Sequence, residues 1–301
     1  MSLELPENDK ELIRGVIDLH VHASPDVFAR PYDESELARQ ARDVGYRALL
    51  FKSHAVINAD RMYYVRKLVP GIEIFGGIVL NYTVGGINPE AVEAALCWDA
   101  KEVWMPNMHA QNHIEVEGVA SYPSLKGLTK KRRSTKEIKG IYILDSSGQV
   151  IPEVYEVLDL IADADVILGT GHLSLVETFA LVKAAKERGV KKILVTHPEW
   201  EVTDFSTEDQ VKLADMGAIM EHCFVPLLPS DRRYDPKLMA ESIKKVGAER
   251  CVMATDLGQY YNTHPIEGMR QFMHIMMNCG ISKKEIEIMT KYNPAQLLGI
   301  S

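Results

Sequence analysis

Long apolar runs are missing from the sequence and cysteine is scarce, and each shortage excludes a class of protein. No apolar stretch reaches the ~18 residues that a membrane-spanning helix needs, so we expect no membrane insertion. The four cysteines form no CxxC pair, and their wide spacing predicts free thiols in a reducing compartment. The segment 1–15 is polar and acidic, unlike a secretory signal, so the cytoplasm is the expected location.

An excess of positive charge is missing as well. The formal net charge of -8 at pH 7 gives no basic face for nucleic acid or for an anionic membrane. Apolar residues make up 46% of the chain, which is ample for one large core. We therefore expect a soluble protein whose partner is a small-molecule substrate. The sequence leaves the oligomeric state open, with a homo-oligomer as one option.

Short apolar, β-branched runs alternate with amphipathic stretches along the whole chain. Such runs are typical of parallel strands buried on both faces, and the stretches between them are typical of helices. The runs are 15–22, 47–54, 73–81, 102–109, 166–172, 192–197, 217–224 and 250–256. Eight strand–helix units predict an α/β fold, a single (β/α)8 TIM barrel that comprises residues 1–301 as one domain.

Capping residues and one long gap refine this prediction. A helix is predicted between Asp235 and Gly247, and Ser282 with Glu285 predicts a capping box at the start of a last helix. The segment 111–151 adds a loop insertion after strand 4, which ends in a hairpin around 146–148. We expect this insertion to cover the rim of the barrel. Its basic run 130–133 either steers an anionic substrate or is merely solvated.

Histidines and one aspartate stand at the carboxyl ends of predicted strands. His20 and His22 lie two apart on the first strand and therefore share a face. His172, His197 and Asp256 end the fifth, sixth and eighth strands. These ends meet at one rim of a barrel, so the five side chains predict a metal site. Nitrogen and carboxylate donors suit zinc first, or another divalent transition metal.

This constellation resembles the amidohydrolase superfamily. The ending NPAQLLG at 293–299 is similar to the NPAxxLG ending common there, and the resemblance covers residues 15–300. Because the HxH motif begins at His20, we expect a barrel-only branch that lacks a flanking β-sandwich. The resemblance implies a metal-dependent hydrolase that cleaves a C–N or C–O bond of an amide, a cyclic amide or a lactone. The alternative is a metal-dependent non-oxidative decarboxylase; a non-catalytic metal-binding protein is disfavoured.

The resemblance also implies a role for each residue. His20, His22, His172 and His197 would hold one or two ions, although His197 would contact water or substrate if only one metal is bound. Asp256 would bind the metal and serve as the general base.

Lys52 marks a departure from the superfamily pattern, because the fourth strand offers no lysine or glutamate at its end. Lys52 and His54 lie two apart at the end of the second strand and should face the centre. Lys52 is then a carbamate bridge between two metals, a cation for a substrate carboxylate or oxyanion, or an amine that reaches solvent.

Other polar residues at strand ends are weaker candidates. His54, Asn81, His109 and His222 are predicted to bind substrate, and His113 could enter the site. Glu221 and His222 are adjacent, so only one of them can point inward. We expect Cys223 to be a buried thiol, and the helical spacing of Met269, Phe272, Met273 and Met276 predicts core packing.

Overall fold

The computed structural model describes residues 6–118 and 139–300. Parallel strands lie side by side around one axis, and each predicted run contains a strand. They are β1 (Ile17–Val21), β2 (Ala48–Phe51), β3 (Glu73–Phe75), β4 (Gly77–Val79), β5 (Glu102–Trp104), β6 (Ile167–Gly169), β7 (Ile193–Thr196), β8 (Ile219–Cys223) and β9 (Cys251–Ala254). The fold is the predicted (β/α)8 barrel.

The third barrel strand is divided into β3 and β4 at Gly76. The Asn58 side chain fills the break, because its Oδ1 accepts from Gly77 N at 2.7 Å and its Nδ2 donates to Phe51 O at 2.8 Å. A Cβ atom on Gly77 would stand 2.2 Å from the Glu102 carbonyl oxygen, so only glycine fits beside β5.

Backbone hydrogen bonds between the last and first strands close the barrel. Asp256 N donates to His20 O, and His22 N donates to Leu257 O, both at 2.8 Å. Parallel pairing therefore continues past the end of β9 and joins the two ends of the sheet.

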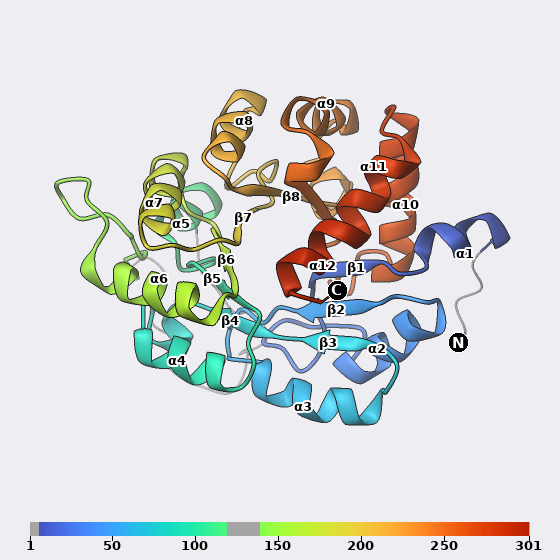
Figure 1. The fold of residues 1–301 in the computed structure, drawn as a ribbon, viewed down its shortest axis with the longest axis horizontal. Helices are drawn as coiled ribbons and strands as arrows, with labels where there is room; N and C mark the ends of the chain where they lie inside the picture. The colour runs from blue at the N-terminus through green and yellow to red at the C-terminus, as the bar shows by residue number, and fades with distance from the viewer. Residues whose placement is uncertain (1–5, 119–138, 301) are drawn as a thin grey trace.

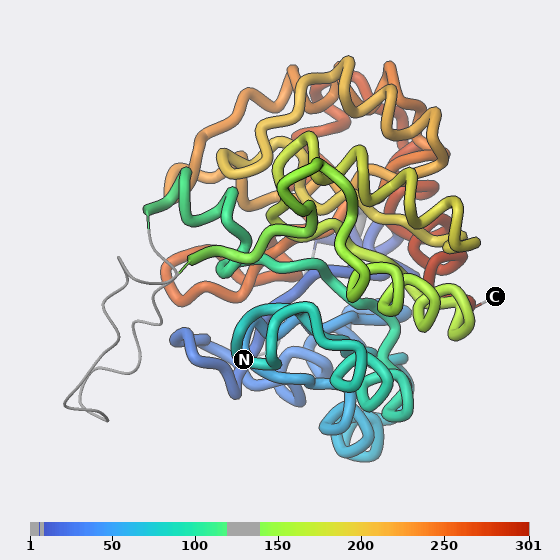
Figure 2. The backbone as a smooth tube through the Cα atoms, turned by 90° about the vertical axis from the view of Figure 1, so that its left-hand side faces the viewer, coloured from blue at the N-terminus to red at the C-terminus, as the bar shows by residue number. Residues whose placement is uncertain are grey.

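Helices surround the strands on the outside (Figure 1). Figure 2 shows the blue and cyan helices on one side of the strands and the yellow and orange helices on the other. The helices are α1 (Glu7–Ile13), α2 (Glu34–Asp43), α3 (Ala59–Leu68), α4 (Pro89–Cys97), α5 (Gln111–Glu117), α6 (Pro152–Ala164), α7 (Leu175–Glu187), α8 (Thr207–Asp215), α9 (Pro236–Val246), α10 (Pro265–Asn278), α11 (Lys283–Glu287) and α12 (Asn293–Leu298). In the described part of the chain, no helix combines the length and apolarity needed to cross a membrane.

The predicted helix ends are confirmed. Asp235 accepts a hydrogen bond from Lys237 N, Gly247 follows α9 at a φ of 94°, and the Ser282–Glu285 capping box begins α11. Such caps satisfy backbone N–H groups that a helix leaves unpaired at its start.

Two apolar clusters form the core. One fills the barrel interior and includes Leu19, Leu50 and Trp104, together with Leu297 and Leu298 of α12. The other lies between strands and helices. It contains the predicted core residues Met269, Phe272, Met273 and Met276, all of which are buried.

The insertion is described at its two ends. Leu144 pairs antiparallel with Val150, which confirms the small hairpin, and α5 places His113 and Glu117 on the wall of a cavity. The basic run 130–133 lies outside the described residues.

Candidate metal centre and cavity

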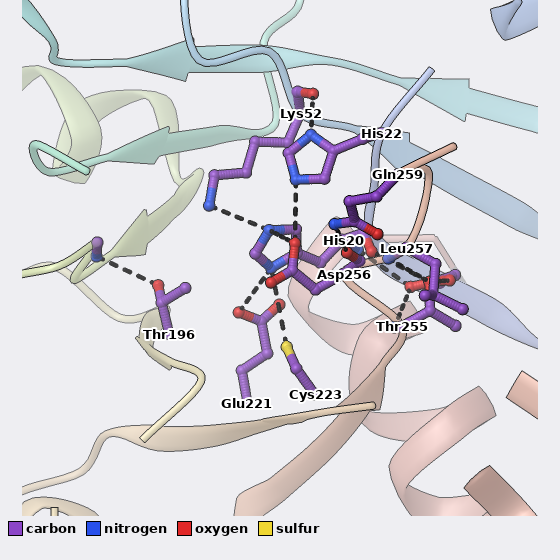
Figure 3. A network of polar contacts seen from close by, with 12 residues as sticks. His20, His22, Lys52, Thr196, Glu221, Cys223, Thr255, Asp256, Leu257 and Gln259 are labelled. Atoms are coloured by element: carbon purple, nitrogen blue, oxygen red, sulfur yellow. Dashed lines mark hydrogen bonds and ion pairs between the residues drawn. The ribbon is translucent and has the colours of Figure 1, made fainter. Parts of the chain in front are cut away.

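Three predicted ligands meet at the carboxyl ends of β1 and β9. Asp256 Oδ1 lies 3.1 Å from His20 Nε2 and 3.0 Å from His22 Nε2 (Figure 3). The pairing of β1 with β2 shifts register between Asp18 and Val21. Irregularities of this kind re-aim side chains near active sites, and here both histidines of the HxH motif reach the same carboxylate.

The backbone is strained at two of the predicted ligands. His197 has a φ of 30° and Asp256 a φ of 54°, which lie in the left-handed region that residues other than glycine rarely adopt. Neighbouring contacts hold both residues there. Thr203 Oγ1 donates to His197 O at 2.6 Å, and Gln259 Nε2 donates to Asp256 O at 2.7 Å.

His20 uses both ring nitrogens. Its Nδ1 lies 3.2 Å from Glu221 Oε2, while its Nε2 faces Asp256 and the Lys52 amine. Burial favours the neutral ring, but the Asp256 and Glu221 carboxylates outweigh it and raise the pKa of His20 to about 9. Burial likewise opposes the charge on Asp256, yet the nearby histidines hold the pKa of that carboxyl well below its usual value.

The Lys52 amine lies inside the barrel. Its Nζ is 3.0 Å from His20 Nε2 and 5.3 Å from the centre of the Trp104 ring, and the residue is only 2% exposed. With the Asn107 amide oxygen turned toward the amine, that oxygen accepts from Lys52 Nζ at 3.0 Å and from His172 Nε2 at 2.7 Å. Burial lowers the pKa of Lys52. The interpretation in which this amine reaches solvent is therefore wrong.

His172 and His197 stand beside this group without joining it. Among the described residues, the donor atoms of His20, His22 and Asp256 form one cluster and those of His20, Glu221 and Cys223 form another. The ring centre of His197 is 5.9 Å from that of His20 and 5.0 Å from that of His172. His172 Nδ1 lies 2.9 Å from Nδ1 of His113, the insertion histidine.

The neighbours on β8 point in opposite directions. Glu221 points inward to His20, and Cys223 is the buried thiol expected, with its sulfur 3.9 Å from His20 Nδ1. His222 points away from the centre, where its Nδ1 lies 2.8 Å from Glu199 Oε1 and its Nε2 3.4 Å from Cys251 Sγ. This placement disfavours the predicted contact between His222 and substrate.

Asn81 and His109 are also withdrawn from the centre. Asn81 Nδ2 donates to His54 O at 2.9 Å, and its Oδ1 accepts from the backbone N–H groups of Asn107 and His109. The side chain thus ties together the loops that follow three strands. His109 is buried with its ring 5.1 Å from that of Tyr82. Neither residue lines the cavity, so this arrangement disfavours substrate binding by their side chains.

A cavity of about 680 Å³ opens above the three-ligand cluster. His54 lines it, with its ring stacked on that of His22 at 4.8 Å. Its walls also include residues that sequence patterns did not single out: Phe28, Arg30, Trp200, Asp231, Tyr260 and Tyr261. All six lie in loops, where no periodicity predicts which side chains turn inward.

The residues present fit a divalent transition metal. Two imidazoles and one carboxylate, with donor atoms within 4.8 Å of one another, are the donor types that zinc and related transition metals prefer. His197 Nδ1 is buried and has no hydrogen-bond partner among the described residues, so a further donor is at hand. Glu221 contacts Nδ1 of His20, the ring nitrogen that is not directed at Asp256. Carboxylates commonly make this contact to metal-binding histidines.

Comparison with known proteins places the chain in a family. Residues 15–221, more than half of the chain, match the family of unknown function DUF6282. The chain belongs to this family. No curated protein matches the sequence.

Solved structures share the fold of this DUF6282 protein at low sequence identity. An amidohydrolase from Pseudomonas aeruginosa is 12% identical over 98% of both chains, with a TM-score of 0.62. 2,6-Dihydroxybenzoate decarboxylase is 9% identical over 95% of this chain and all (100%) of that chain, with a TM-score of 0.61. The phosphotriesterase homology protein from Escherichia coli, solved with phosphate in its active site, is 15% identical over 94% and 98% of the two chains, with a TM-score of 0.55. These likenesses show the barrel fold.

Proposed function

We propose that this protein is a metal-dependent hydrolase of the amidohydrolase superfamily. It would cleave a C–N or C–O bond of a small amide, cyclic amide or lactone. The observation that carries the proposal is the convergence of His20, His22 and Asp256 at the base of a cavity that can admit a small molecule. The cytoplasmic location remains part of the same expectation.

The metal would be held by His20, His22 and Asp256, with His172 and His197 as adjacent donors. Zinc is the first candidate, as one ion or two. When bound, the ion supplies Lewis acidity that favours ionisation of water and polarises a carbonyl group.

Asp256 and His197 are the proposed acid–base residues. Because Asp256 is ionised, its carboxylate can accept the proton of the attacking water and pass it to the leaving nitrogen or oxygen. His197 lines the cavity and is buried, so it can orient the water or the substrate carbonyl.

Lys52 is proposed to bind a substrate oxyanion as a cation. Its amine lies between His20 and the Asn107 amide, at the base of the cavity. The alternative role is a carbamate that bridges two metals. A Lys52→Ala variant distinguishes the two roles, because added acetate can replace a carbamate but cannot replace a cation. We expect Lys52→Ala to lose activity and acetate not to restore it.

Decarboxylation is the second candidate, and one feature favours it. The Lys52 amine lines the cavity 3.0 Å from His20 Nε2, so a substrate carboxylate could be held near the metal.

Metal content and a substrate panel test the proposal. Protein expressed with zinc, manganese, cobalt or iron should contain about one or two ions per chain by elemental analysis. The double variant His20→Ala/His22→Ala should lose them, whereas His274→Ala, which removes a histidine on α10 outside the cavity, should retain them. The panel then measures hydrolysis of lactones, cyclic amides and N-acyl amino acids, and CO2 release from aromatic carboxylates. Absence of metal from the native protein would overturn both functions, and CO2 release without hydrolysis would favour the second.

A further inference from the structure

We propose that Arg30 forms an oxyanion-binding subsite in the cavity, and that the substrate therefore carries a carboxylate or phosphate group at a distance from the bond that is cleaved. This inference rests on the proposed function, because it names a class of substrate for the same cavity.

The loop after β1 fixes the Arg30 side chain. Arg30 Nε donates to Asp26 Oδ2 at 2.7 Å, and the two side chains are only 4% and 1% exposed. Asp26 is itself held by the backbone, because its Oδ1 accepts from Val27 N at 2.6 Å. The guanidinium carbon also lies 5.5 Å from the centre of the Phe28 ring. Arg30 is therefore already ordered, so a ligand that binds it loses little side-chain entropy.

Asp26 leaves part of the guanidinium available. It contacts Nε, and the terminal Nη nitrogens have no hydrogen-bond partner within residues 6–118 and 139–300. A guanidinium presents paired N–H donors in a rigid plane, and such a pair matches two oxygens of a carboxylate or phosphate. An amide or hydroxyl group offers a single acceptor and matches it less well.

Arg30 lies on the His22 side of the candidate metal centre. It lines the cavity together with His22, His54 and Tyr261. Its guanidinium packs on Phe28, whose ring centre lies 5.8 Å from that of His54, and the His54 ring is stacked on that of His22. Arg30 therefore brings guanidinium N–H donors to the wall of the cavity beside His22 and His54.

The cavity wall also carries the acidic residues Asp231 and Glu117. Asp231 accepts from Trp200 Nε1 at 3.1 Å, and its pKa is raised by burial and by the Asp256 and Glu201 charges. Glu117 lines the same cavity, and burial together with the Glu201 and Asp231 charges raises its pKa. A ligand anion would therefore be repelled by the Asp231 carboxylate and attracted by the Arg30 guanidinium.

Binding of benzoate and inorganic phosphate to metal-free protein tests the subsite. Titration calorimetry after removal of metal with a chelator excludes anions bound to the metal itself. We expect one or both anions to bind, neutral benzamide to bind at least tenfold more weakly than benzoate, and Arg30→Gln to weaken anion binding at least tenfold. Tighter binding of benzoate indicates a substrate carboxylate, and tighter binding of phosphate indicates a phosphate group.

Two further variants keep the test decisive. Arg30→Lys retains a cation that can pair with Asp26 but removes the planar donor pair, so it should also weaken anion binding while preserving the thermal midpoint. Arg39→Gln changes an exposed arginine of α2 outside the cavity and should leave binding unchanged. Anion binding that is absent from the native protein, or unaltered in folded Arg30→Gln and Arg30→Lys, would overturn the subsite. Metal content is measured separately from anion binding. A failure of the proposed hydrolase can therefore be distinguished from a failure of the Arg30 subsite.

Discussion

Glu221 Oε2 lies 3.2 Å from Nδ1 of His20, and both side chains are completely buried, at 0% exposure. A neutral imidazole has one N–H, so a hydrogen bond from Nδ1 to this carboxylate leaves the Nε2 lone pair directed toward Asp256 and His22. Glu221 thus selects the tautomer of His20 that can bind a metal in the cavity.

Glu221→Gln should weaken zinc binding by a factor of about 10 to 100, the usual effect of losing a carboxylate behind a metal-binding histidine. Competition with a chromophoric chelator measures this affinity. Glu102→Gln is the matched control, because Glu102 is also buried in the barrel interior, where burial and the Glu221 charge raise its pKa well above its ordinary value. Equal zinc affinity in the native and Glu221→Gln proteins would contradict the positioning role.

Metal binding should strengthen as pH rises from 7 to 9. In the metal-free protein the pKa of His20 is raised to about 9, chiefly by Asp256 acting against burial, so the ring holds a proton at pH 7. A metal must displace that proton, and the apparent affinity should increase by about tenfold per pH unit until the ring is neutral. Chelator competition at several pH values, with zinc hydrolysis corrected, measures the slope. A flat profile between pH 7 and 9 would show that His20 is not a ligand.

Asp256→Asn should lower kcat by a factor of about 10² to 10⁴ once a substrate is known, because the amide keeps the shape of the side chain but cannot accept the water proton. The variant should fold normally and retain most of its metal. Asp231→Asn changes another acid of the cavity and serves as the control, with kcat expected to stay near the native value. Near-native kcat in metal-loaded Asp256→Asn would move the base to His197.

His222→Gln should destabilise the fold through Glu199. The two side chains are buried with His222 Nδ1 2.8 Å from Glu199 Oε1, and the loss of one partner of a buried pair typically costs about 3–5 kcal/mol. Glu199 belongs to the loop that carries His197 and Trp200, so this contact also holds the cavity wall.

The same pair predicts a pH dependence of stability. Burial opposes the His222 charge, but Glu199 and Cys251 raise the pKa of His222 to about 10, above its ordinary value of 6.5. The folded state therefore binds this proton more tightly, and the stabilisation is complete below pH 6.5 and lost as pH rises through 10. Urea unfolding between pH 7 and 10 should show a steeper loss in the native protein than in His222→Gln. The pair of the partly exposed His274 with Asp9 offers a control, and His274→Gln should keep the native slope.

Sequence patterns were sufficient for the fold and for the grouping of three residues of the candidate site. Short apolar, β-branched runs, helix caps such as Asp235 and Ser282, and the rule that parallel strands end at one rim depend on local chemistry and on topology. They placed His20, His22 and Asp256 at one centre and Lys52 in the interior, where the structure has them.

Only the tertiary structure decided how individual side chains are used. Alternation along β8 requires that one of Glu221 and His222 point inward, but only the register of β8 in the barrel selects Glu221. Likewise, Asn81 has the chemistry of a substrate ligand, yet its amide is occupied by backbone groups of loops distant in sequence. The position of Arg30 was not predictable from the sequence. Its side chain lines the cavity and contacts Asp26 in a loop, and loop geometry has no periodic pattern in the sequence. The sequence by itself determined the barrel and which residues could gather at its rim, because both follow from local periodicity; the partner of each polar side chain was decided by contacts between remote segments, which no local pattern encodes.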